Sequence, residues 1–184
     1  MPTLETIFLK IYTMSYYDVI LLLLVFSLAL CILHILVKNR AVFRFAMGFL
    51  VFLWLAAVLS ETLFLRSVSD RYDTNWRPLA SYISAFTAGG QRELLRSNFM
   101  NAVLFYPAGF IAALILPKTV KPFFKLLISF FASLVLSTAI ELLQFSLLLG
   151  NAQTDDIIHN VAGAVIGTGA LIIFEHIHNK KQKS

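Results

Sequence analysis

The sequence predicts an all-α integral membrane protein with five transmembrane helices, and three observations support this fold class. Hydrophobic residues make up 59% of the 184 residues and charged residues only 14%, whereas a soluble domain is usually about 25% charged. The mean hydropathy is +0.80. Five apolar stretches are each close to the ~20 helical residues that cross the hydrocarbon core of a bilayer.

Each predicted helix is one of these apolar stretches. The first contains the single cysteine, Cys31, so no disulfide framework is expected. It is expected to be retained rather than removed as a signal peptide, because Lys10 is the only basic residue before it. The fourth is long enough to tilt or to extend past the bilayer. The five helices are expected at about residues 18–37, 42–65, 99–116, 122–149 and 157–174.

The longest connecting segment, residues 66–97, lies between the second and third helices. Within it the stretch "LASYISAF" (79–86) alternates apolar and polar residues. That pattern predicts a short amphipathic helix on the membrane surface.

The distribution of lysine and arginine predicts the orientation, because cytoplasmic segments carry an excess of these residues. Nine of the 15 fall on one side of the five helices, which places the N-terminus outside and the C-terminus in the cytoplasm. The net charge of +5 is therefore interpreted as a sign of topology, and no nucleic-acid partner is expected. The nine are Lys38, Arg40, Arg44, Lys118, Lys121, Lys125, Lys180, Lys181 and Lys183.

Polar residues recur on single faces of four of the predicted helices, toward the outer leaflet. In the fifth helix, spacings of four, three and four residues place them on one face. Glu141 is the strongest single candidate, since an ionisable residue inside an apolar segment is a functional hypothesis by default. The stripes are Glu61, Thr62 and Arg66; Asn98, Asn101, Phe105 and Gly109; Ser133, Ser137, Glu141 and Gln144; and Asp156, Asn160, Gly163 and Gly167.

Several of these residues also have a purely structural interpretation. Gly163 and Gly167 form a G-x-x-x-G pattern, which lets two helices approach closely. Pro107 can kink the third helix, and polar amides can join helices by hydrogen bonds. His159 is expected to point away from the face that carries Asp156 and Asn160.

Three blocks of sequence resemble the VanZ-like membrane proteins: "NAVLFYPAGF" (101–110), "ELLQ" (141–144) and "DDIIHNVAGAVIG" (155–167). Two weaker stretches, "TLFLR" (62–66) and "NWRPL" (75–79), fit the same pattern. The resemblance covers roughly residues 42–175. It implies an N-terminal helix with its flanks (1–41), a VanZ-like helical membrane domain (42–175) and a basic cytoplasmic tail (176–184). The chain departs from the family at "LLLGNAQ", where other members usually carry an arginine.

The resemblance also implies a function, that of a multi-pass protein of the cell membrane associated with low-level resistance to the glycopeptide teicoplanin. An outward-facing polar pocket would bind a cell-envelope lipid or headgroup and alter drug access at the cell surface. Expected partners are membrane lipids and either a lipid-linked cell-wall precursor or the glycopeptide. No metal or other cofactor is expected. The expected ligand-binding residues are Arg66, Asn75, Asn101, Glu141, Gln144, Asp155, Asp156 and Asn160, and the helix-packing residues are Pro107, Gly109, Gly163 and Gly167.

Three alternatives stay open from the sequence. An enzyme that modifies an envelope lipid would use Glu141 and Asp156 as acid and base, or as ligands of a divalent cation. No histidine joins their face, however, and no Ser-His-Asp spacing occurs. A transporter would need polar groups continuing to the cytoplasmic side, where the helices are nearly all apolar. In the third alternative the polar residues bind nothing and only fix the register of the helices.

Overall fold

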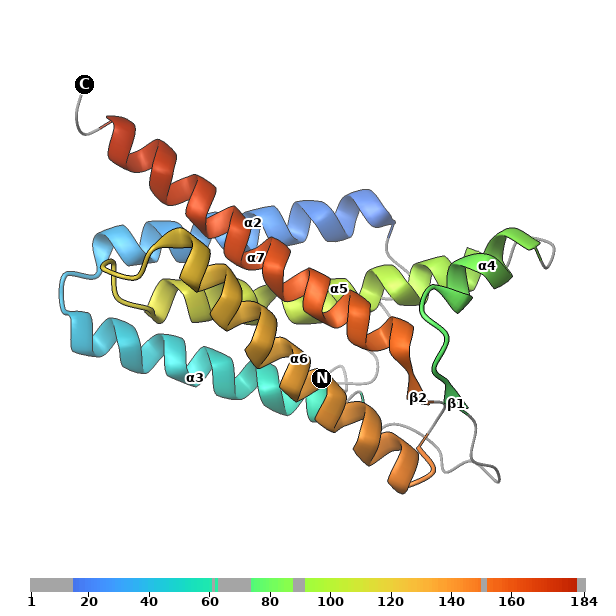
Figure 1. Cartoon of the computed structure of the whole chain (residues 1–184). Coiled ribbons are helices and arrows are strands. Elements are labelled where there is room, and N and C mark those ends of the chain that lie inside the picture. Colours follow the sequence, from blue (N-terminus) through green and yellow to red (C-terminus); the bar gives the residue numbers. More distant parts are fainter. Residues whose placement is uncertain (1–14, 61, 63–73, 88–91, 150–151, 182–184) are drawn as a thin grey trace, which may run out of the picture. The chain divides into compact units, whose positions relative to one another are not determined.

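A computed structural model of the chain describes residues 15–60, 62, 74–87, 92–149 and 152–181. Within these ranges five helices are long and apolar enough to cross a membrane, namely α2, α3, α5, α6 and α7. The all-α fold class and the five spans are confirmed; the direction of crossing stays a prediction. The elements are α2 (Tyr16–Leu36), α3 (Arg40–Leu59), β1 (Thr74–Asn75), α4 (Ala80–Thr87), α5 (Arg92–Ile115), α6 (Pro122–Ser146), β2 (Ala152–Gln153) and α7 (Thr154–Lys181) (Figure 1).

The chain divides into two compact units, residues 1–65 and 66–184. In the first unit, a short turn joins α2 to α3. The Asn39 side chain caps α3 by accepting hydrogen bonds from the backbone N–H groups of Ala41 and Val42. Near this turn the rings of His34 and Phe43 pack edge to face with their centroids 4.9 Å apart.

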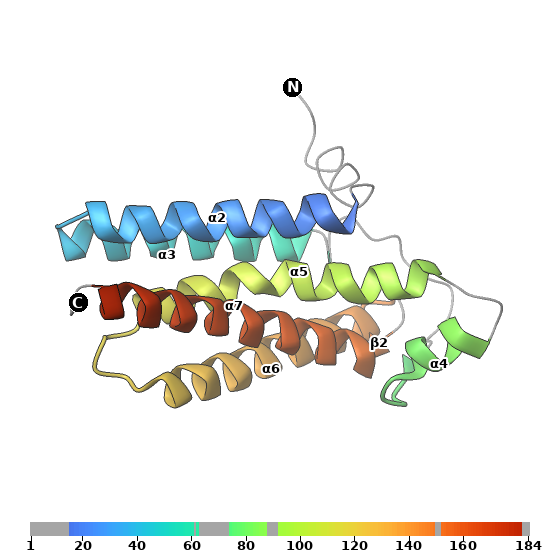
Figure 2. The same ribbon diagram turned by 90° about the horizontal axis from the view of Figure 1, so that it is seen from above.

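The second unit is built on the close contact of α5 with α7, which run parallel and side by side (Figure 2). Three glycines make the approach possible, because a Cβ atom on any of them would overlap the backbone of the facing helix. The Thr168 hydroxyl also donates a 3.0 Å hydrogen bond to the backbone carbonyl of Gly109. The three glycines are Gly109, Gly163 and Gly167.

Helix α6 packs antiparallel against α7. Near the middle of both helices, the Ser129 hydroxyl donates to the carbonyl of Ala164 at 3.2 Å. At one end, the ammonium of Lys125 lies 2.8 Å from a carboxylate oxygen of Glu175. Lys125 lies in the first turn of α6, within the predicted helix 122–149, and is buried.

The Lys125–Glu175 pair is expected to respond unequally to the loss of each partner. The Lys125 side chain is only 3% exposed, whereas that of Glu175 is 31% exposed. Glu175→Gln should therefore cost about 3 kcal/mol, since it leaves a buried ammonium without its counter-charge. Lys125→Met should cost much less, because water can still reach the remaining carboxylate. Unfolding of both variants in detergent micelles tests this order, and a larger loss in Lys125→Met would contradict it.

Two of the helices extend beyond their apolar stretches. α5 begins at Arg92 rather than near Phe99, and α7 runs from Thr154 to Lys181 rather than from about Ile157 to Phe174. Hydropathy detects only the part of a helix that lies in the hydrocarbon core, while the helical hydrogen bonds continue into the polar ends. These added turns carry several of the residues that form the site.

Candidate functional site

The site begins with a two-residue strand pair that brings residues 74–81 to the start of α7. β1 pairs in parallel with β2, with Thr74 opposite Ala152 and Asn75 opposite Gln153, and β2 leads directly into α7. The Asn75 side chain accepts a 3.3 Å hydrogen bond from the N–H of Arg77. Asn75, expected to bind ligand, is seen here shaping the turn that leads to α4.

The Asp155 side chain forms hydrogen bonds with the segment that leads into α4. Its carboxylate accepts hydrogen bonds from the backbone N–H groups of Leu79 and Ser81, the latter at 2.8 Å, and from the Ser81 hydroxyl. The Ser81 hydroxyl oxygen in turn accepts a 2.8 Å hydrogen bond from the Asn98 side-chain amide of α5. Leu79 has φ of 62°, a left-handed conformation that costs a leucine about 1–2 kcal/mol. Asp155 thereby joins the start of α7 to α4 and, through Ser81, to α5.

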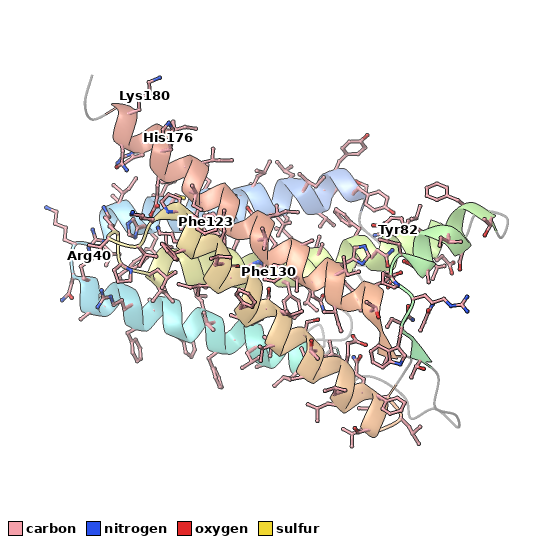
Figure 3. All side chains as sticks on the ribbon, viewed as in Figure 1. Arg40, Tyr82, Phe123, Phe130, His176 and Lys180 are labelled. Atoms are coloured by element: carbon pink, nitrogen blue, oxygen red, sulfur yellow. The ribbon has the colours of Figure 1, made fainter. Side chains whose placement is uncertain are left out.

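His159 makes a second connection between α7 and α4. Its ring Nδ1 lies against the backbone carbonyl of Asp155, which can only accept, so Nδ1 carries the hydrogen. Nε2 then accepts a 2.8 Å hydrogen bond from the Tyr82 hydroxyl. Figure 3 places Tyr82 beside the first turns of α7. The four-residue spacing from Asp155 to His159 is the sequence signal for this shared face.

Asp156, next to Asp155 in the chain, bonds to a different helix. The Asn101 side-chain amide of α5 donates a 2.6 Å hydrogen bond to its carboxylate. Successive residues of a helix point about 100° apart, so the two aspartates can serve different neighbours. Asp156 and Asn101 are half-buried, in contrast to the buried Asp155.

Helix α6 contributes buried polar residues from its last turns. Glu141 accepts a 3.0 Å hydrogen bond from the N–H of Gln153 in β2. Gln144 lies one turn further along the same face and is buried as well. One turn before Glu141, the Ser137 hydroxyl oxygen accepts a 2.9 Å hydrogen bond from the side-chain amide of Asn160.

Asn160 has an unmatched polar atom. The residue is only 6% exposed, and its side-chain oxygen has no hydrogen-bond partner among the described residues. The oxygen and nitrogen of an amide can be exchanged by rotation, so in either orientation one of the two lacks a partner within the described part of the chain. Buried polar groups in proteins are nearly always hydrogen-bonded, so this atom is an exception within the site.

Polar residues at this end of the second unit form two groups; every member of the second group was predicted to bind ligand, but in the first group only Asp155 was. The first, named the clasp, comprises Ser81, Tyr82, Asn98, Asp155 and His159, and it fixes α4. The second, named the polar cluster, comprises Asn101 of α5, Glu141 and Gln144 of α6, and Asp156 and Asn160 of α7. Arg66 lies outside the described residues. Within the described ranges, no three His, Cys, Asp or Glu side chains come together in a way that could hold a metal ion.

The comparisons with known proteins point to one family. The family model described as VanZ/LLP1 matches residues 45–175, a range that contains the whole clasp and the whole polar cluster. No curated protein and no solved structure matches the chain.

Proposed function

The chain belongs to the VanZ/LLP1 family, and from this premise we propose that its polar cluster binds a cell-envelope lipid, or the headgroup of one, at the outer leaflet. Binding there contributes to low-level teicoplanin resistance by altering drug access at the cell surface. The five apolar helices make the chain a multi-pass membrane protein, and its membrane is the cell membrane.

The observation that carries this proposal is the unmatched side-chain oxygen of Asn160, whose amide nitrogen bonds to Ser137 one turn before the buried Glu141. A buried amide oxygen without a hydrogen bond costs about 1–3 kcal/mol. A hydroxyl, amide or phosphate group of a lipid headgroup supplies the missing partner. Asp156 and Asn101 are half-buried, so the cluster has a margin through which such a group can enter.

Charge supports an outward position for the cluster. The opposite end of the second unit carries Lys118, Lys121, His176 and Lys180, all exposed. Figure 3 places His176 and Lys180 at the far end of α7 from Tyr82. Because basic residues favour the cytoplasmic side, the polar cluster belongs at the outer side. Glycopeptides and their lipid-linked cell-wall targets meet at that leaflet, so a lipid-linked cell-wall precursor or the glycopeptide itself fits as the partner.

Loss of either carboxylate of the polar cluster is expected to remove resistance without removing the protein. Teicoplanin susceptibility would be measured in a sensitive Gram-positive host that expresses wild type, Glu141→Gln or Asp156→Asn, with membrane levels matched by immunoblot. Wild type should raise the inhibitory concentration, and both variants should return it to the level of cells with an empty vector. The reason is that each substitution replaces a charged acceptor with a neutral amide in the same volume.

Glu93→Gln is the matched control, because Glu93 is an exposed glutamate in the first turn of α5, outside the polar cluster. It should protect as well as wild type. Full protection by Glu141→Gln and Asp156→Asn at equal protein level would contradict the proposal and leave the cluster with a packing role. If the Glu141→Gln protein fails to fold and disappears from the membrane, Glu141 has a packing role instead.

A further inference from the structure

Helix α4 has two faces of opposite character. Ser81 and Ala85 are buried on the side that the clasp holds. Leu79, Ile83 and Phe86, spaced four and three residues apart, share the opposite side. Ile83 is 62% exposed and Phe86 is 78% exposed, so this apolar face has no cover among the described residues.

The position of the clasp determines where that face points. α4 is bonded to Asn98 and His159, which are not the first residues of α5 and α7 but lie in their second turns. At ~1.5 Å per residue, these contacts are about 7–9 Å along each helix from its start. α4 therefore lies beside the flanks of two membrane-spanning helices, and its outer face points sideways, away from them.

The polar start of α7 places this level at the membrane boundary. Its first two turns carry Asp155, Asp156 and Asn160, and such side chains are costly in the hydrocarbon core. The first turns of α7 therefore favour the headgroup region. An apolar helix face that points sideways at this depth meets lipid rather than bulk water.

We propose that α4 is an interfacial helix whose apolar face, Leu79, Ile83 and Phe86, is covered by lipid at the boundary between headgroups and acyl chains. Tyr82 of the clasp follows this face on the helix surface and bonds to His159 through its hydroxyl, a position that suits its amphipathic ring. Trp76, four residues before α4, is exposed as well. The clasp sets the depth of α4 in the membrane. The contact of its apolar face with lipid does not depend on which ligand the polar cluster binds.

Fluorescence quenching tests this proposal in the full chain. Trp54→Phe with Trp76→Phe removes both native tryptophans, and Phe86→Trp then adds one reporter on the apolar face. The protein is reconstituted in phosphatidylcholine vesicles that contain lipid brominated either close to the headgroup or close to the chain end. The lipid brominated close to the headgroup should remove most of the fluorescence, and aqueous iodide should remove little.

Two control positions calibrate the depth. Val135→Trp places a reporter on an exposed residue in the middle of α6 and should respond most to lipid brominated at the chain end. Ser84→Trp, on a flank of α4 turned about 100° away from Ile83, should be quenched more by iodide than Phe86→Trp is. Strong iodide quenching of Phe86→Trp would overturn the proposal, since the face would then point to water. Protection from both quenchers would overturn it as well, because a second copy of the chain would then cover the face.

Discussion

Gly163→Ala is expected to lower the unfolding free energy of the membrane domain by about 3 kcal/mol, the upper end of the usual cost of overpacking. A Cβ atom at Gly163 would lie 2.0 Å from the carbonyl oxygen of Ala102 and 2.7 Å from its carbonyl carbon. Both are backbone atoms of α5 and cannot rotate aside. The two helices would have to separate, which would lengthen the hydrogen bonds from Thr168 to Gly109 and from Asn101 to Asp156.

Gly169→Ala is the matched control on the same helix, since a Cβ atom there would meet nothing within 4 Å. It should leave stability unchanged or raise it by about 0.5–1 kcal/mol, because alanine favours the helix over glycine. Thermal unfolding of the two variants in the same detergent gives the comparison. Equal stability of Gly163→Ala and Gly169→Ala would mean that the backbones of α5 and α7 are further apart than in the structure.

Asp155→Asn is expected to free α4 from α7. The carboxylate accepts three hydrogen bonds, and hydrogen bonds to charged groups contribute about 1.5–3 kcal/mol each. An asparagine has one acceptor oxygen, and its NH₂ group would face a backbone N–H or the Ser81 hydroxyl. Leu79 would then have no compensation for its left-handed backbone. Hydrogen exchange of the Leu79 and Ser81 amides should accelerate by two or more orders of magnitude, at about 1.4 kcal/mol for each factor of ten.

The neighbouring Asp156→Asn separates this effect from a general loss of negative charge. Its carboxylate bonds to Asn101 rather than to the α4 segment, so exchange at Leu79 and Ser81 should stay slow. Equal acceleration in both variants would show that the clasp does not depend on Asp155 in particular. The two aspartates would then act together as one charged unit.

The fold was predictable from the sequence because crossing a bilayer requires a long apolar helix, and that requirement is local. The same local reasoning failed at the helix ends, since the polar turns Arg92–Asn98 of α5 lie outside the hydrocarbon core. The burial of Lys125 and its pairing with Glu175 were not predictable in this way, because the two residues are 50 positions apart in the chain.

The residues of the polar cluster were named from the sequence as candidates, whereas Ser81 and Tyr82 of the clasp were not. Helical spacing puts Asp156 and Asn160 on one side of α7, and the structure gives them different partners, Asn101 of α5 and Ser137 of α6. The roles of Asp155 and His159 depend on Leu79, Ser81 and Tyr82, more than 70 residues earlier in the chain. The periodicity of a single helix cannot predict contacts with residues so far away in the chain. The spacing of four between Asp155 and His159 was the one available signal.

The packing of α7 also bears on how the protein is made. α5 and α6 contact each other little, whereas both pack along α7, which follows them in the chain. Until α7 arrives, Asn101 lacks Asp156, and Ser137 lacks Asn160. Assembly of residues 92–181 must therefore wait until α7 has been synthesised. A chain that stops before residue 154 leaves Asn101 and Ser137 without these hydrogen bonds, and unmatched polar groups are costly inside a membrane.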